Sequence, residues 1–121
     1  MAEKLASRLP KNILIRLIDT ASLPINEQIA IIRKTDYFVG VHGAGLCLSI
    51  YAPTHCIFHE ILPKPNMNGL LLMAALSGHK TYSDIIEVEI EDIDGNELLF
   101  FNADQIAQNV ISHMKENKLI D

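Results

Sequence analysis

Short apolar runs of strand length alternate with segments of helical pattern along most of this chain. The apolar runs cover Asn12–Asp19, Asp36–Gly43 and His55–Leu62. Such runs are typical of strands that are buried on both faces of a sheet. Strands that alternate with helices favour a parallel sheet, because a parallel connection needs a long crossover that is usually a helix. The sequence therefore predicts an α/β fold.

The segments between these runs carry helix signals, and they cover residues 22–35, 44–52 and 68–78. Pro24 suits the first turn of the first helix, with Ser22 or Leu23 near its cap. Gly78 suits the C-terminal end of the third helix. The predicted order is therefore β-α-β-α-β-α.

The C-terminal part predicts a β-hairpin followed by a helix. Apolar and acidic residues alternate over residues 86–91, and a turn signal follows at residues 94–96. Apolar residues then recur at four-residue spacing from Ile106 to Met114, with Asn102 as a suitable cap.

Length and composition agree with one folded domain. The chain has 121 residues, of which 49% are hydrophobic, so it has enough apolar surface to form a core. We predict a single Rossmann-like domain over residues 1–121, with three α/β/α layers and a mainly parallel sheet. The apolar fraction is high for this length. We therefore also expect an apolar surface that faces a partner, either another subunit or an absent domain.

The charge of the chain restricts its partners. A formal net charge of −5 excludes nucleic acid as the default partner, because phosphate backbones need a basic surface. No apolar stretch has the length of a membrane span, so we expect no membrane contact from this segment. The acidic run over residues 81–97 favours a solvated strand face and hairpin over a metal site.

Four residues, Gly40, His42, Gly43 and Gly45, stand between two apolar runs, where a strand should end and a helix begin. A helix N-terminus offers free N–H groups and the positive end of a dipole, which together favour an anion. Glycine lets a phosphate approach the backbone, and His42 can donate a hydrogen bond to it. A tight turn or close packing would use the same glycines, and spacing alone favours neither interpretation.

Known phosphate-binding motifs match this corner only in part. A P-loop needs Lys and Ser or Thr after its last glycine, whereas Leu and Cys follow Gly45. The dinucleotide fingerprint is matched at Gly43 and Gly45, but Leu48 stands at its third glycine. Glu60 lies at the end of the next predicted strand, about where a ribose-binding acid is expected. A stand-alone nucleotide or dinucleotide-binding module therefore stays open, whereas the G-x-S-x-G elbow of esterases is absent.

The histidines and cysteines do not form a metal motif. On a strand, His55 and His59 share a face while Cys56 points to the opposite face. The sequence contains neither a C-x-x-C pair nor H-E-x-x-H, and His79 is distant in sequence. We therefore expect no metal ion and no other cofactor.

Residues 12–83 resemble glycosyltransferase family 61. The shared pattern is a hydrophobic strand, then His-Gly-Ala-Gly-Leu at His42–Leu46, then an apolar helix that ends near Pro53. A further strand runs into Glu60–Pro63, which has the family's Glu-h-h-Pro form, where h is hydrophobic. The chain has Val41 where the family often has Pro before the histidine.

This resemblance implies one half of a GT-B arrangement, in which two Rossmann-like lobes face each other. The chain would be the C-terminal, donor-binding lobe or a fragment of a larger protein, and its missing partner would be the N-terminal lobe. The implied activity is transfer of a sugar from a nucleotide sugar, UDP-linked, to a protein or glycan acceptor without a metal ion. The isolated chain is expected to be inactive. The compartment would be the ER or Golgi lumen if the parent resembles eukaryotic members, and the cytoplasm otherwise.

The resemblance also implies roles for individual residues. Those expected to bind the nucleotide or its phosphates are His42, Gly43, Ala44, Gly45, Leu46 and Glu60. His42 is in addition the candidate catalytic residue. A non-catalytic interaction domain that keeps the lobe fold is the other alternative, and its apolar surplus predicts a homodimer.

Overall fold

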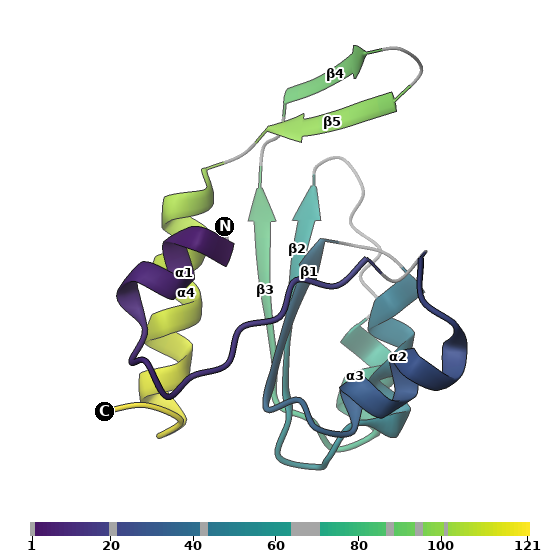
Figure 1. Cartoon of the computed structure of the whole chain (residues 1–121), viewed down its shortest axis with the longest axis vertical. Coiled ribbons are helices and arrows are strands. Elements are labelled where there is room, and N and C mark those ends of the chain that lie inside the picture. The colour runs from purple at the N-terminus through teal and green to yellow at the C-terminus, as the bar shows by residue number, and fades with distance from the viewer. Residues whose placement is uncertain are drawn as a thin grey trace. The chain divides into compact units, whose positions relative to one another are not determined.

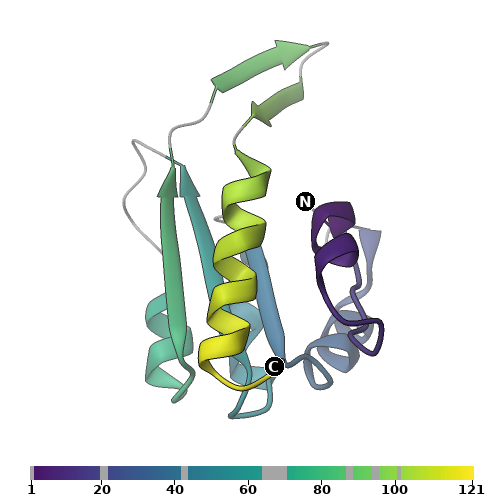
Figure 2. The same cartoon turned by 90° about the vertical axis from the view of Figure 1, so that its left-hand side faces the viewer.

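The computed structural model describes residues 2–19, 22–41, 44–63, 71–86, 89–93, 96–100 and 102–121. The chain forms two compact units, and Figures 1 and 2 show the elements of both. Unit 1 comprises Met1–Ile18 and Phe101–Asp121, and unit 2 comprises Asp19–Phe100. The single domain over residues 1–121 stays a prediction.

Unit 2 contains a parallel sheet with the strand order β1-β2-β3. The three strands are β1 Tyr37–Val41, β2 Ile57–Pro63 and β3 Thr81–Ile86. Their arrows point the same way in Figure 1. This sheet and its helices confirm the α/β class. The third strand, however, lies where the sequence predicted only a lead-in to the hairpin.

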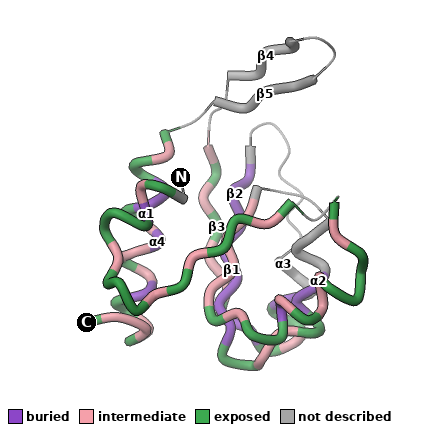
Figure 3. Tube along the Cα trace, in the orientation of Figure 1, coloured by how far each residue is buried: buried purple, intermediate pink, exposed green. Residues whose placement is uncertain are grey.

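The helices of unit 2 share one apolar core with the sheet, and they are α2 Ile25–Ile32, the 3₁₀-helix η2 Ala44–Tyr51 and α3 Leu71–Leu76. Each contributes a buried residue to a cluster around Phe58 of β2, namely Ile32, Leu48 and Ala74. These contacts place all three helices on the same face of the sheet, and β2 is the buried centre of the unit in Figure 3. The three-layer arrangement stays a prediction.

The predicted helix end at Gly78 is confirmed. Gly78 has φ 86°, a left-handed conformation that glycine adopts without steric cost. The N–H of His79 then donates to the carbonyl of Ala74 at 3.0 Å, as in a Schellman motif.

The predicted strand over Asn12–Asp19 is wrong. The structure has no strand in this segment, and Leu14 and Leu17 are 85% and 88% exposed. Apolar composition only makes a segment suitable for a strand, because a strand also needs a neighbour that accepts and donates its backbone hydrogen bonds.

The cap of α2 lies one or two residues after the predicted Leu23 or Ser22. The cap position is Pro24, which makes no side-chain capping hydrogen bond. Ser22 Oγ instead donates to the carbonyl of Asp19 at 2.9 Å. The helix therefore begins after the proline rather than around Ser22.

The predicted hairpin is confirmed as β4 Glu89–Ile93 and β5 Asn96–Phe100, which pair antiparallel. Asp94 and Gly95 of the predicted turn lie outside the described residues. In the part of the chain that the structure describes, no helix has the length and apolar character needed to cross a membrane.

Unit 1 is built from α1 Ala2–Arg8 and α4 Ala103–Glu116. The first helix was not predicted. The second was, and its cap is confirmed, because Asn102 accepts a hydrogen bond from the N–H of Gln105. Asp104 joins the two helices through Lys4 at 2.8 Å and Arg8 at 2.9 Å. The hydrogen bond from Lys4 lowers the pKa of Asp104, and the charges of both basic residues act in the same direction.

Lys118 occupies a conformation that suits glycine better. Its φ is 60°, and the N–H of Leu119 donates to the carbonyl of Met114 at 2.9 Å, which closes the C-terminus of α4. A residue with a Cβ costs roughly 1–2 kcal/mol in this region. Extra freedom of glycine in the unfolded chain offsets about 0.4–1 kcal/mol of that gain.

We therefore expect Lys118→Gly to raise the free energy of unfolding by about 0.5–1 kcal/mol. Urea denaturation followed by circular dichroism measures this change. The control is Lys115→Gly, an exposed position inside α4, which should lower the same quantity by about 1 kcal/mol. A loss of stability in both variants would contradict the explanation.

Candidate functional site

The glycine corner joins β1 to η2. The strand ends at Val41 and the helix begins at Ala44, so only two residues connect them. These two, His42 and Gly43, lie outside the described residues. Ala44–Leu46 form the first turn of η2. The backbone N–H groups of a first turn have no acceptor within their own helix, so they can donate to a ligand. The predicted change from strand to helix is therefore present around the corner.

Glu60 lies inside β2 rather than at the strand end that the sequence suggested. It pairs with Gly40 of β1 and with Ser83 of β3, so the three residues form one row across the sheet. Because strand side chains alternate, Glu60 shares a face with Phe58, the face that carries the helices. The side chain has 0% exposure. The corner thus follows the last residue of β1, whereas Glu60 lies at the middle of the neighbouring strand β2.

A polar cluster that the sequence did not predict lies on the opposite face of the sheet. The Tyr37 hydroxyl is 2.7 Å from Nδ1 of His59, and Nε2 of the same ring is 2.5 Å from Oδ2 of Asp84. His59 has 0% exposure. Burial raises the pKa of Tyr37 above its usual range, and nearby Tyr82 and Asp84 raise it further. Tyr37, His59 and Asp84 are far apart in sequence, so no spacing pattern could predict their contact. Alternation along β2 does predict that His59 and Glu60 point to opposite faces of the sheet.

The histidines and the cysteine discussed above as possible metal ligands contact different groups. Exposed His55 lies 2.6 Å from Oδ1 of Asp36. Buried His79 contacts the carbonyls of Ser49 and Cys56 at 2.9 and 3.0 Å. Burial raises the pKa of the Cys56 thiol to about 12. Among the residues that the structure describes, no group of three or more His, Cys, Asp or Glu is placed to hold a metal ion.

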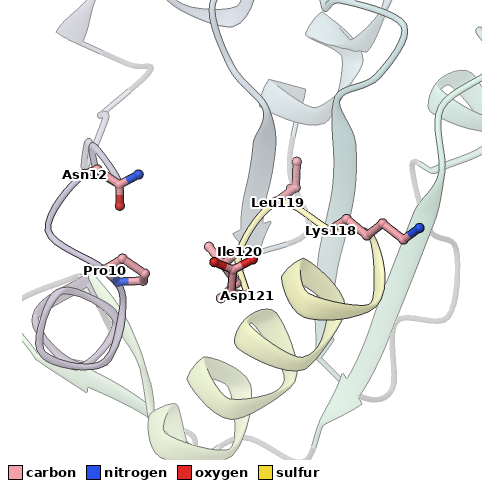
Figure 4. Close-up of a pocket in the computed structure, with 6 residues that line it drawn as sticks. All are labelled: Pro10, Asn12, Lys118, Leu119, Ile120 and Asp121. Carbon is pink, nitrogen blue, oxygen red and sulfur yellow. The ribbon is translucent and has the colours of Figure 1, made fainter.

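A pocket of about 200 Å³ lies in unit 1 (Figure 4). Its lining residues are Pro10, Asn12, Lys118, Leu119, Ile120 and Asp121. None of the candidate site residues lines this pocket, so it is not part of the candidate nucleotide site.

Comparisons with known proteins give one match. No curated protein matches the chain, and no solved structure does. The family model described as Glycosyltransferase 61 matches residues 1–58. The matched segment includes the whole His42–Leu46 corner and ends before Glu60. Residues 1–58 of the chain are therefore similar to the glycosyltransferase 61 family.

Proposed function

We propose that the chain is the donor-binding lobe of a glycosyltransferase that takes a sugar from a UDP-linked nucleotide sugar and transfers it to a protein or glycan acceptor. The observation that carries this proposal is the family match over residues 1–58, because it includes the corner where β1 leads into η2.

The chemistry of the corner suits a diphosphate. The N–H groups of the first turn of η2, at Ala44–Leu46, point away from the helix body and have the positive end of its dipole behind them. Gly43 and Gly45 carry no Cβ that would keep phosphate oxygens from these N–H groups. His42 would donate a further hydrogen bond. These donors would stabilise the negative charge that develops on the departing nucleoside diphosphate.

Glu60 would recognise the nucleoside. A carboxylate accepts hydrogen bonds, and the ribose of UDP offers hydroxyl donors. Its row also contains Gly40, which lies two residues before His42 along the chain. Because Glu60 has no exposed surface, this part of the proposal requires the ribose to displace groups that now cover the carboxylate.

The remaining parts of the reaction would come from elsewhere. An N-terminal lobe would supply the acceptor site and a base that removes the proton from the acceptor hydroxyl. With N–H groups and His42 on the diphosphate, charge stabilisation would need no metal ion. The isolated chain is therefore expected to bind the donor without turning it over.

Titration of the full chain with UDP, followed by two-dimensional NMR, tests this proposal. We expect the largest shift changes at Gly40, Val41, Ala44–Leu46 and Glu60. Changes confined to other residues would contradict the proposed site. Stronger binding of NAD than of UDP would favour a dinucleotide-binding module instead.

A variant of the corner makes the test quantitative. Gly45→Val would place a branched side chain beside the proposed phosphate, and each hydrogen bond to a charged group contributes about 1.5–3 kcal/mol. We expect the UDP affinity to fall roughly tenfold or more. Ala30→Val, at an exposed position of α2, should leave the affinity unchanged. An equal loss in both variants would contradict a specific role for Gly45.

A further inference from the structure

Three polar side chains form a diagonal line across the parallel sheet of unit 2. Tyr37 comes from β1, His59 from β2 and Asp84 from β3. In the sheet register His59 is opposite Val39 and Tyr82, so each of its two polar partners lies two residues along the neighbouring strand. Residues two positions apart on a strand share a face, and the three side chains therefore meet on one side of the sheet.

The chemistry of the three groups determines which atom donates and which accepts in each hydrogen bond. A carboxylate at Asp84 has only acceptor oxygens, so Nε2 of His59 must carry the proton between them, at 2.5 Å. In a neutral imidazole Nδ1 is then an acceptor, and the Tyr37 hydroxyl at 2.7 Å donates to it. The raised pKa of Tyr37 agrees with a hydroxyl that keeps its proton.

Buried hydrogen bonds between these three side chains stabilise one strand register relative to the alternatives. His59 has no exposed surface, so losing either neighbour would leave a polar ring atom buried without its hydrogen bond, which is unfavourable. Slippage of β2 by one residue would turn His59 to the face that carries the helices and break both contacts at once. Apolar side chains at these positions would pack in either register and would not discriminate between them.

We propose that Tyr37, His59 and Asp84 form a register clamp, which holds β1, β2 and β3 in the pairing that places Glu60 opposite Gly40, as the nucleotide site requires. Glu60 follows His59 directly, and Gly40 is opposite Glu60. The clamp residues are positioning residues, because their side chains lie on the face opposite to that of Glu60. Their effect on nucleotide binding rests on the proposed function, whereas their effect on strand register does not.

The first test of the register clamp is spectroscopic. In the full chain labelled with ¹⁵N-histidine, His59 should show a protonated Nε2 and an unprotonated Nδ1 at neutral pH. A protonated Nδ1 would overturn the assigned direction of the hydrogen bonds. Tyr37→Phe should move the Nδ1 signal of His59, because it removes the donor and leaves the rest of the ring contact in place.

The second test compares hydrogen exchange in two variants. Tyr37→Phe removes one hydroxyl of the clamp, whereas Ile32→Val removes one buried methyl group from the helix-side core and no hydrogen bond. At the amides of Ile61 and Leu62 we expect roughly tenfold faster exchange in Tyr37→Phe than in Ile32→Val, since an unsatisfied buried partner remains. Equal exchange at these amides would show that Tyr37 acts through packing alone, and would overturn the clamp.

UDP binding then separates the clamp from the proposed function. If the wild-type chain binds UDP, Tyr37→Phe should weaken binding several-fold more than Ile32→Val does, and an equal effect would refute the positioning role. If the wild-type chain does not bind UDP, the proposed function fails. The exchange and ¹⁵N measurements still decide whether the clamp exists.

Discussion

Phe58→Ala is expected to lower the free energy of unfolding by about 3–5 kcal/mol, the usual cost of removing a buried aromatic ring. Phe58, the second residue of β2, has 0% exposure. Its ring stacks on Phe38 with centroids 5.4 Å apart and lies 5.0 Å from the ring of His79. Its removal would leave a cavity between the sheet and all three helices of unit 2. Urea denaturation followed by circular dichroism measures the loss.

The control for this prediction is Tyr51→Ala. Tyr51 is an aromatic residue of η2 in the same unit, but it is 40% exposed. Less area is removed from water on folding, so its truncation should cost clearly less than that of Phe58. Similar losses in the two variants would mean that Phe58 is not the centre of the core. Because whole domains have a stability of about 5–15 kcal/mol, a large loss at Phe58 would leave little folded protein.

His79→Leu is expected to lower the free energy of unfolding by about 1–3 kcal/mol, although it replaces a polar side chain by an apolar one. His79 is 7% exposed. Its ring nitrogens lie 2.9 Å from the carbonyl of Ser49, near the end of η2, and 3.0 Å from that of Cys56, directly before β2. Leucine fills a similar volume but donates to neither carbonyl. An imidazole in its neutral form has one N–H and donates to one of the two carbonyls, and a buried carbonyl that loses its donor costs about 1–3 kcal/mol.

His55→Leu is the matched control for His79→Leu. The same exchange is made at a histidine that lies directly before Cys56 but is 60% exposed, with Asp36 as its partner. An exposed ion pair contributes about 0–1 kcal/mol, so this change should be nearly neutral. The comparison uses thermal and urea unfolding of both variants at one pH. If His55→Leu proved as damaging as His79→Leu, the two carbonyl contacts would not explain the effect.

The strand-to-helix corner of the candidate site could be predicted from local sequence pattern. A corner between a strand and a helix is specified by a few adjacent residues, and the glycine cluster predicted such a corner between Val41 and Ala44. The position of Glu60 was predicted less well. Its place along β2 depends on where pairing with β1 and β3 continues, and the strand extends to Pro63.

The clamp residues show the opposite case. His59 attracted attention only as a metal ligand, whereas the structure pairs it with Tyr37 and Asp84. Tyr37 and Asp84 belong to different strands, and the order of those strands places His59 between them. From the sequence we predicted no strand in the segment that contains Asp84, so the contact between Asp84 and His59 could not be predicted.

The sequence by itself determined the features that depend on neighbours within a few residues. These include the alternation of strands and helices, the left-handed end of α3 at Gly78, the cap of α4 at Asn102 and the hairpin. Tertiary structure alone decided the strand order, the faces taken by His59 and Glu60, and the exposure of Leu14 in a segment suited to a strand. The physical reason is that local dihedral preferences and capping are set by adjacent residues. Strand pairing instead depends on backbone partners that only the folded chain brings together.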